Sequence, residues 1–376
     1  MPASNSTFTQ APFPVSTQNN AAAAVRPAQP SLAIKGHDPS LDALRIVAML
    51  MVILIHTSGK GFPNLSDHWW AVNTYESLSR ACVPIFFMIT GALLLPRSHT
   101  VKNVLQRSWR IAFVLVAWSV IFLLYGRYKA ASLPDLAMLR AWVGEILRGP
   151  VMGHLWYLYS LIAAYFFIPV LAGFFKTTEV RLQSLVLCVW FIGGSLLPFL
   201  NRTHGDLKLG IDIQFFYIYP AYILAGALLY KHFHMNLNRF VVCSMVWVIA
   251  TAGTAYFTWH HSVKAQAGIE LYYEYFAPLV VIATLALFCA VRYIGAWIAD
   301  RSAQAGKVMM FLGGLTFGVY LIHPMIILEF EGHGYGWNYT NPWLAIPSVM
   351  FGVAVVSGLI TYIIKRVPYL RALIPG

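Results

Sequence analysis

Long apolar runs recur along this chain from about residue 41 onward, and each lasts about 16 to 22 residues, enough for one helix to cross a membrane. Membrane strands are shorter and alternate apolar with polar side chains, so these runs favour helices over a barrel. The sequence therefore predicts an all-α, polytopic membrane helix bundle with about ten transmembrane helices. We expect spans near residues 42–58, 80–96, 110–126, 154–174, 183–200, 214–230, 240–258, 272–291, 309–328 and 344–364.

The charged residues set the expected orientation of the bundle. The chain has 26 Lys and Arg residues against 14 Asp and Glu, a net charge of +12. The basic residues lie between spans and form no basic domain, so we expect attraction to anionic membrane lipids and no binding of nucleic acid. A cytoplasmic N-terminus places most of them on the cytoplasmic side, with Arg80 at the edge of the second span. Both termini are then cytoplasmic.

The first 40 residues differ in composition from the rest of the chain. They are rich in Ala, Pro, Ser, Asn, Gln and Thr and hold no apolar run. Such a segment cannot bury enough apolar surface to fold alone, so we expect residues 1–40 to be a disordered cytoplasmic tail. Residues 41–370 show no internal repeat and no long soluble insertion, and they are expected to form one membrane-embedded domain.

The first apolar run carries three ionisable residues, Asp42, Arg45 and His56. His56 stands eleven positions after Arg45, which is about 20° from a whole number of helical turns, so the two share one helix face about 16 Å apart. Ionisable side chains at membrane depth are costly and indicate a functional site. Alternatively, Asp42 and Arg45 anchor the helix at the membrane surface, and His56 caps its outer end.

A second basic cluster, Arg107 and Arg110, begins the third span. Residues three apart lie on one helix face, and the topology places Arg45 at the same side of the membrane. Three guanidinium groups around a helical cavity suit a polyanionic ligand such as a nucleotide phosphate. The alternative is that the pair only anchors the helix end in the lipid headgroups.

Further polar residues stand at two other spans. His154 and Trp156 open the fourth span and would line an outer mouth of the protein, although an interfacial aromatic belt explains the tryptophan equally well. His323 precedes a helix-kinking proline and is either a second cavity histidine or a structural, hydrogen-bonded one. Pro84 near the start of the second span and Gly91 within it are expected to let the helix bend or let a neighbouring helix approach closely. The remaining histidines lack metal-ligand spacing, so we expect no metal site.

This set of residues resembles acyltransferase family 3, integral membrane proteins that transfer acyl groups onto extracytoplasmic or lipid-linked glycans. The resemblance covers nearly all of residues 41–370. It rests on Arg45 with His56 after ten intervening residues, on the pair Arg107 and Arg110, and on the phrases VPIFFMITGALLL, HLWYL and YLIHP. The phrase FFMITGALLL particularly resembles the polysaccharide O-acetyltransferase branch of the family.

The resemblance implies an acyl-CoA co-substrate, usually acetyl-CoA, without a bound cofactor, and a hydroxyl acceptor on a cell-envelope glycan or lipid-linked saccharide. Arg45, Arg107 and Arg110 would hold the CoA phosphates, and Asp42 would orient Arg45. His56 would act as general base, which we favour, or as nucleophile through an acyl-histidine. His154, Trp156 and His323 are further expected substrate contacts. The implied location is the inner cell membrane, with polysaccharide biosynthesis proteins as candidate partners.

A transporter or flippase for a lipid-linked sugar or small anion is the competing prediction. Ten spans, buried histidines and a proline-broken helix also suit a carrier. The lack of an internal repeat and the clustering of arginines at one membrane face count against it.

Overall fold

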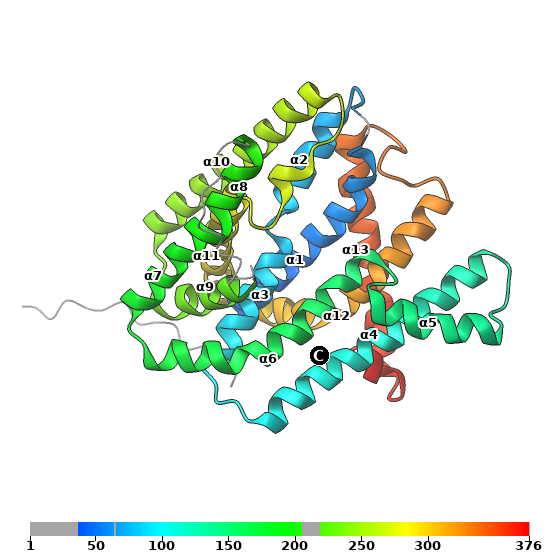
Figure 1. Cartoon of the computed structure of the whole chain (residues 1–376), viewed down its shortest axis with the longest axis horizontal. Helices are drawn as coiled ribbons and strands as arrows, with labels where there is room; N and C mark the ends of the chain where they lie inside the picture. Colours follow the sequence, from blue (N-terminus) through cyan, green and yellow to red (C-terminus); the bar gives the residue numbers. More distant parts are fainter. Residues whose placement is uncertain (1–36, 64, 205–218, 376) are drawn as a thin grey trace, which may run out of the picture.

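A computed structural model describes residues 37–63, 65–204 and 219–375, and the regular structure in these ranges is entirely helical (Figure 1). The predicted all-α fold is thus confirmed. The predicted tail lies outside the described residues as far as residue 36. The α-helices are α1 (Pro39–Ser58), α2 (Trp69–Ser79), α3 (Cys82–Leu94), α4 (Val101–Lys129), α5 (Leu136–Arg148), α6 (Trp156–Thr177), α7 (Val180–Trp190), α8 (Leu197–His204), α9 (Tyr219–His232), α10 (Leu237–Ala265), α11 (Pro278–Arg301), α12 (Ala303–Gly332) and α13 (Pro342–Arg366). Short 3-10 or π segments are η1 (Gly59–Gly61), η2 (Gly153–Leu155), η3 (Phe191–Leu196), η4 (Glu270–Tyr273) and η5 (Leu370–Leu373).

Within the described ranges, nine helical stretches are long and apolar enough to cross a membrane, and each overlaps one of the predicted spans. The span predicted at 214–230 begins outside the described residues, and its described part is α9. The second span differs most from its prediction, because it begins at Trp69 and combines α2 with α3. Arg80 therefore lies inside this span, and its predicted place at the edge is wrong.

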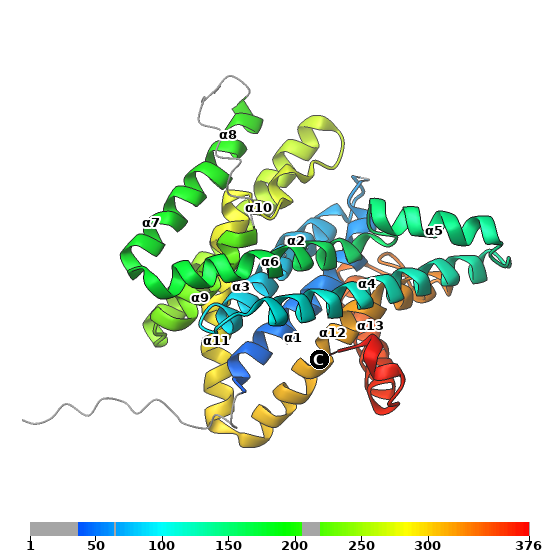
Figure 2. The same cartoon turned by 60° about the horizontal axis from the view of Figure 1, so that its bottom comes forward.

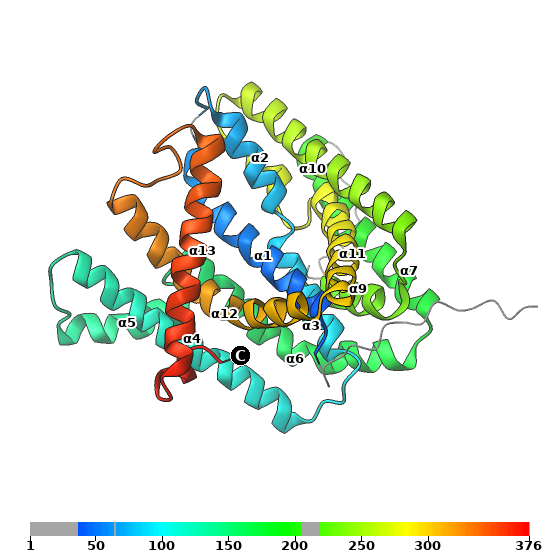
Figure 3. The same cartoon turned by 180° about the vertical axis from the view of Figure 1, so that it is seen from behind.

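Helix α1 runs through the middle of the bundle, with α2, α3, α11, α12 and α13 packed around it (Figures 1 and 3). The helix starts at Pro39, where a missing N–H costs nothing, and the Asp38 side chain caps it by accepting from the Ser40 N–H at 2.9 Å. Leu44, Ala48 and Ile53 are fully buried. The ionisable residues of α1 are thus surrounded by protein helices rather than lipid.

Two glycines bring α3 and α9 into backbone contact. A Cβ atom added to Gly91 would lie 1.8 Å from the Ile223 carbonyl oxygen, and one added to Gly226 would lie 2.1 Å from the Met88 carbonyl oxygen. The predicted close approach at Gly91 is confirmed. This contact fixes α3, one wall of the site described below, against its neighbour.

Polar contacts distinguish two ends of the bundle. At the end that holds the start of α1, Tyr230 donates to Asp38 at 2.6 Å and Lys176 donates to the Arg97 carbonyl. At the opposite end, Lys129 pairs with Glu329 at 2.7 Å. We call these the inner end and the outer end, following the orientation predicted from the basic residues. Figure 2 shows α4 and α6 lying side by side across the bundle. Residues of this layer, of α1 and of α2, α3 and α12 line the cavity described next.

Candidate functional site

A cavity of about 520 Å³ follows α1 through the bundle. Its α1 wall includes Arg45, Val52, His56 and Gly59, which span about 20 Å at 1.5 Å of helical rise per residue. Both Arg45 and His56 line it, as their eleven-residue spacing predicts. The His56 side chain is exposed although its helix lies in the centre of the protein, so its open surface faces the cavity. The cavity volume is in the range of small-molecule sites.

The inner end of the cavity carries two guanidinium groups. Arg45 donates from Nη1 to Asp42 Oδ1 at 2.6 Å, and Asp42 also contacts His37 Nε2 at 2.5 Å. Asp42 is fully buried and does not line the cavity, so it positions Arg45 from behind. Arg110, from α4, is exposed and supplies the second cation of this end. Asp42 compensates the charge of Arg45, whereas Arg110 has no ion pair among the described residues, so an anion at this end would meet an uncompensated charge.

Arg107 lies apart from this cavity wall, although it is on the same helix as Arg110. Its Nη1 lies 3.3 Å from His99 Nδ1 in the loop before α4, and His99 Nε2 lies 2.9 Å from the Leu94 carbonyl oxygen. A carbonyl only accepts, so Nε2 carries the proton and Nδ1 accepts from Arg107. Partial burial, together with the charge of Arg107, lowers the pKa of His99 below its ordinary value. The neutral ring therefore holds Arg107 at the inner surface.

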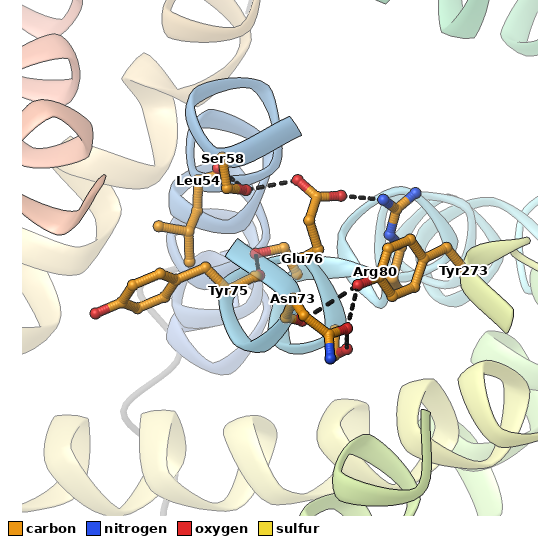
Figure 4. A network of polar contacts seen from close by, with 9 residues as sticks. Leu54, Ser58, Asn73, Tyr75, Glu76, Arg80 and Tyr273 are labelled. Carbon is orange, nitrogen blue, oxygen red and sulfur yellow. Dashed lines mark hydrogen bonds and ion pairs between the residues drawn. The ribbon is translucent and has the colours of Figure 1, made fainter. Parts of the chain in front are cut away.

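The outer part of the cavity contains a buried ion pair that the sequence prediction missed (Figure 4). Glu76 is 1% exposed, pairs with Arg80, and accepts from Ser58 Oγ at 2.5 Å. The Arg80 guanidinium also lies 4.1 Å from the centre of the Tyr273 ring. Glu76 and Arg80 line the cavity together with Glu270. The sequence signal was the four-residue spacing of opposite charges, which places both on one helix face.

His323 lies behind His56, fully buried and outside the lining of the cavity. The two ring centroids are 5.2 Å apart. His323 Nδ1 lies 2.7 Å from the Tyr320 carbonyl oxygen, and its Nε2 has no hydrogen-bond partner among the described residues. The structure thus brings His323 to the candidate catalytic histidine, in a supporting position.

His154 and Trp156 both line the cavity, on the side opposite α1. His154 is 3% exposed, and neither ring nitrogen makes a hydrogen bond of ordinary geometry with the described residues, although the backbone of Leu321 is near enough to interact. The Trp156 ring stacks on Tyr275, with ring centroids 5.9 Å apart. These two aromatic rings continue toward a neighbouring outer cavity of about 760 Å³ that Arg80 and Glu270 also line.

The arrangement joins three chemical environments in one continuous space. Cations at the inner end suit an anionic group, and an imidazole in the middle can transfer a proton. Carboxylates, Arg80 and aromatic rings at the outer end together suit a polyhydroxylated molecule. Two reactants that enter from opposite ends would therefore meet at His56.

Comparison with known proteins gives a consistent result. Residues 38–362 match the family model described as an acyltransferase domain. Acyltransferase MdmB of Streptomyces mycarofaciens is 24% identical to the chain over 379 residues, which cover 89% of this chain and 92% of that protein. No solved structure matches the chain.

Proposed function

This chain belongs to acyltransferase family 3, and on that premise we propose that it transfers an acyl group, most commonly acetyl, from acyl-CoA to a hydroxyl of a cell-envelope glycan or lipid-linked saccharide. The chain is a multi-pass membrane acyltransferase by its family and by the nine candidate spans among its described residues. We further propose the inner cell membrane as its location and polysaccharide biosynthesis proteins as the suppliers of its acceptor. Family membership favours this function over the transporter alternative.

One observation carries the proposal. A single cavity holds Arg45 and Arg110 at its inner end, and His56 lies about 16 Å from Arg45 along α1. Arg45 and Arg110 would bind the CoA phosphates, for which guanidinium groups offer paired hydrogen bonds. The narrow pantetheine arm would then follow α1 and place the thioester beside His56. Arg107 would add a charge at the cytoplasmic surface, outside the cavity itself.

In the proposed reaction, His56 acts as general base. Its free ring nitrogen takes the proton of the acceptor hydroxyl while the hydroxyl oxygen bonds to the acyl carbon. The bond between that carbon and the CoA sulfur then breaks, and the proton passes from the imidazolium to the departing thiolate. The products are an acyl ester and CoA, and base catalysis of this kind contributes typically about 10²- to 10⁴-fold.

The acceptor would enter from the outer end. Sugars present hydroxyl groups on ring edges and apolar C–H groups on ring faces, which match carboxylates and aromatic rings respectively. The outer cavity offers Glu270 and the stacked rings of Trp156 and Tyr275. This pairing supports a saccharide as the acceptor class.

The test is transfer of radiolabelled acetyl from acetyl-CoA into the glycan and lipid-glycan fractions of membranes that contain the protein. We expect transfer by the wild type and by His68→Ala, and its loss in His56→Ala. His68 is a matched control because it is an exposed histidine at the start of α2, without a capping hydrogen bond. Free CoA thiol should appear in equal amount to the transferred label.

Two results would contradict the proposal. Transfer that persists in a stable His56→Ala variant would remove His56 from the chemistry. A complete lack of label in membranes rich in envelope glycans, combined with movement of a lipid-linked sugar across the membrane, would favour the transporter alternative.

A further inference from the structure

Pro324 interrupts the hydrogen bonding of α12 next to His323. Proline has no N–H, so the carbonyl four residues earlier, that of Tyr320, has no helical donor. His323 Nδ1 lies 2.7 Å from this oxygen and 3.2 Å from the Val319 carbonyl oxygen. Carbonyl oxygens only accept, so Nδ1 carries a proton. In a neutral His323 ring, Nε2 therefore bears a lone pair.

That lone pair has a candidate donor in His56. His323 Nε2 is buried and has no hydrogen-bond partner among the described residues. The described residues show no hydrogen bond between the two rings, whose centroids are 5.2 Å apart. An imidazole nitrogen lies about 1 Å from its ring centre, so nitrogens turned to face each other across this distance would lie about 3 Å apart, a hydrogen-bond length. The two residues come from different helices, α1 and α12, which pack together along the centre of the bundle.

We propose that His323 is a positioning residue for His56: its Nε2 accepts an N–H from His56 and so leaves the other His56 nitrogen with its lone pair toward the cavity. This inference rests on the proposed acyl transfer, in which that lone pair takes the proton of the acceptor hydroxyl. His323 itself takes up no proton. In effect, Pro324 frees a backbone carbonyl, the carbonyl fixes the His323 tautomer, and His323 fixes the His56 tautomer.

His154 is a second imidazole close to His323, with ring centroids 5.4 Å apart. One lone pair cannot serve two donors fully. Of the two imidazoles, His56 is exposed to the cavity, whereas His154 is only 3% exposed. The tautomer of His56 is therefore the one that an acceptor hydroxyl in the cavity would meet, and we assign the lone pair of His323 to His56.

Two amide substitutions test the roles of the two His323 ring nitrogens separately. In His323→Asn the amide N–H₂ can occupy the place of Nδ1 and keep the Tyr320 carbonyl satisfied, but nothing accepts from His56. In His323→Gln the amide oxygen can occupy the place of Nε2 and accept from His56. A third variant, His323→Leu, keeps an apolar side chain in this buried position and offers neither group.

Steady-state kinetics and thermal stability should be measured for all three variants. We expect His323→Gln to keep kcat within about tenfold of the wild type, while Asn and Leu lower it about 100-fold, in the range of a lost general base. The KM values for acetyl-CoA and acceptor should change less than about threefold. A kcat for Asn equal to or above that of Gln, or a loss confined to KM, would overturn the proposal.

A second measurement is independent of acyl transfer. The ¹⁵N spectrum of histidine-labelled protein reports which ring nitrogen is protonated, and the His56→Ala variant identifies the His56 signals. We expect one fixed tautomer of His56 in the wild type and exchange between tautomers in His323→Asn. Tautomer exchange of His56 in a wild type that transfers acyl groups would refute the positioning role and leave the proposed function standing. A fixed His56 tautomer in a protein that transfers no acyl group would refute the proposed function and leave the positioning role standing.

Discussion

The buried pair of Glu76 and Arg80 makes a quantitative prediction for Glu76→Gln. The two carboxylate oxygens of Glu76 have separate partners, Ser58 and Arg80, and the side chain is almost completely buried inside the second span. Removal of its charge leaves the guanidinium inside the membrane with Tyr273 as its remaining close contact. Breaking one side of a buried ion pair costs about 3–5 kcal/mol.

We place the expected loss near the lower limit, about 3 kcal/mol, because glutamine keeps the size of the side chain and one hydrogen-bond acceptor. This corresponds to a change of about 100-fold in the folding equilibrium. The double variant Glu76→Leu/Arg80→Met removes both charges, and it should recover much of the lost stability because apolar replacements of a buried ion pair are often neutral or stabilising. It should nevertheless fail to transfer label, because both residues line the cavity.

Reversible unfolding in mixed detergent micelles, followed by tryptophan fluorescence, measures these differences. Glu331→Gln is the matched control, because it makes the same change in an exposed ion pair, with Lys60 at the outer end, where the expected loss is about 0–1 kcal/mol. If Glu76→Gln is as stable as the wild type, or if the double variant is no more stable than the single one, the ion-pair argument is refuted.

Three further predictions follow from the packing and charge of the described residues. Arg110→Gln should raise the KM for acetyl-CoA about 10-fold or more with little change in kcat, since a hydrogen bond to a charged group contributes about 1.5–3 kcal/mol; an unchanged KM would remove it from the donor site. Gly91→Ala should lower stability by more than about 1 kcal/mol, while Gly314→Ala, whose added Cβ meets nothing within 4 Å, should not; equal stabilities would contradict the backbone contact of α3. His99→Leu should lower the free energy of unfolding least at low pH. The pKa of His99 is lowered on folding, so the stability that the neutral ring contributes is present above about pH 6.5 and is lost as pH falls. The unfolding curves of wild type and variant should therefore converge at low pH.

Helical periodicity explains what the sequence could predict. Apolar runs identified the helices because each backbone polar group must be satisfied within the membrane, and nine of the predicted spans overlap a candidate span. The spacing of Arg45 and His56 placed both on one face, and both line the cavity. Gly91 packs as its small size suggested. Each of these predictions depends on residues within one helix.

The errors arose at polar residues whose burial in the membrane is stabilised by a hydrogen-bond partner far away in the sequence. Counting apolar residues excluded α2 from the second span, because Asn73, Glu76 and Arg80 interrupt the run. In the fold, Asn73 donates to the Ala255 carbonyl at 2.9 Å and also accepts from Tyr273, so its polarity is satisfied by α10 and η4. Such tertiary partners cannot be read from a local window.

The polar groups inside the spans fall into two kinds, those with a partner three or four residues away on the same helix and those without one. Asp42 and Arg45, Glu76 and Arg80, and His323 with the Tyr320 carbonyl are pairs three or four residues apart, so each of these groups has a partner on its own stretch of helix. His56 and His154 have no such local partner among the described residues, and they lie at the middle of the cavity with His323 Nε2 beside them. A fold that pairs its costly groups locally gains nothing in stability from three partly unpaired imidazoles. Three imidazoles at one point, between two arginines at the inner end and the carboxylates of Glu76 and Glu270 with Arg80 at the outer end, fit the proton-transfer step that we propose.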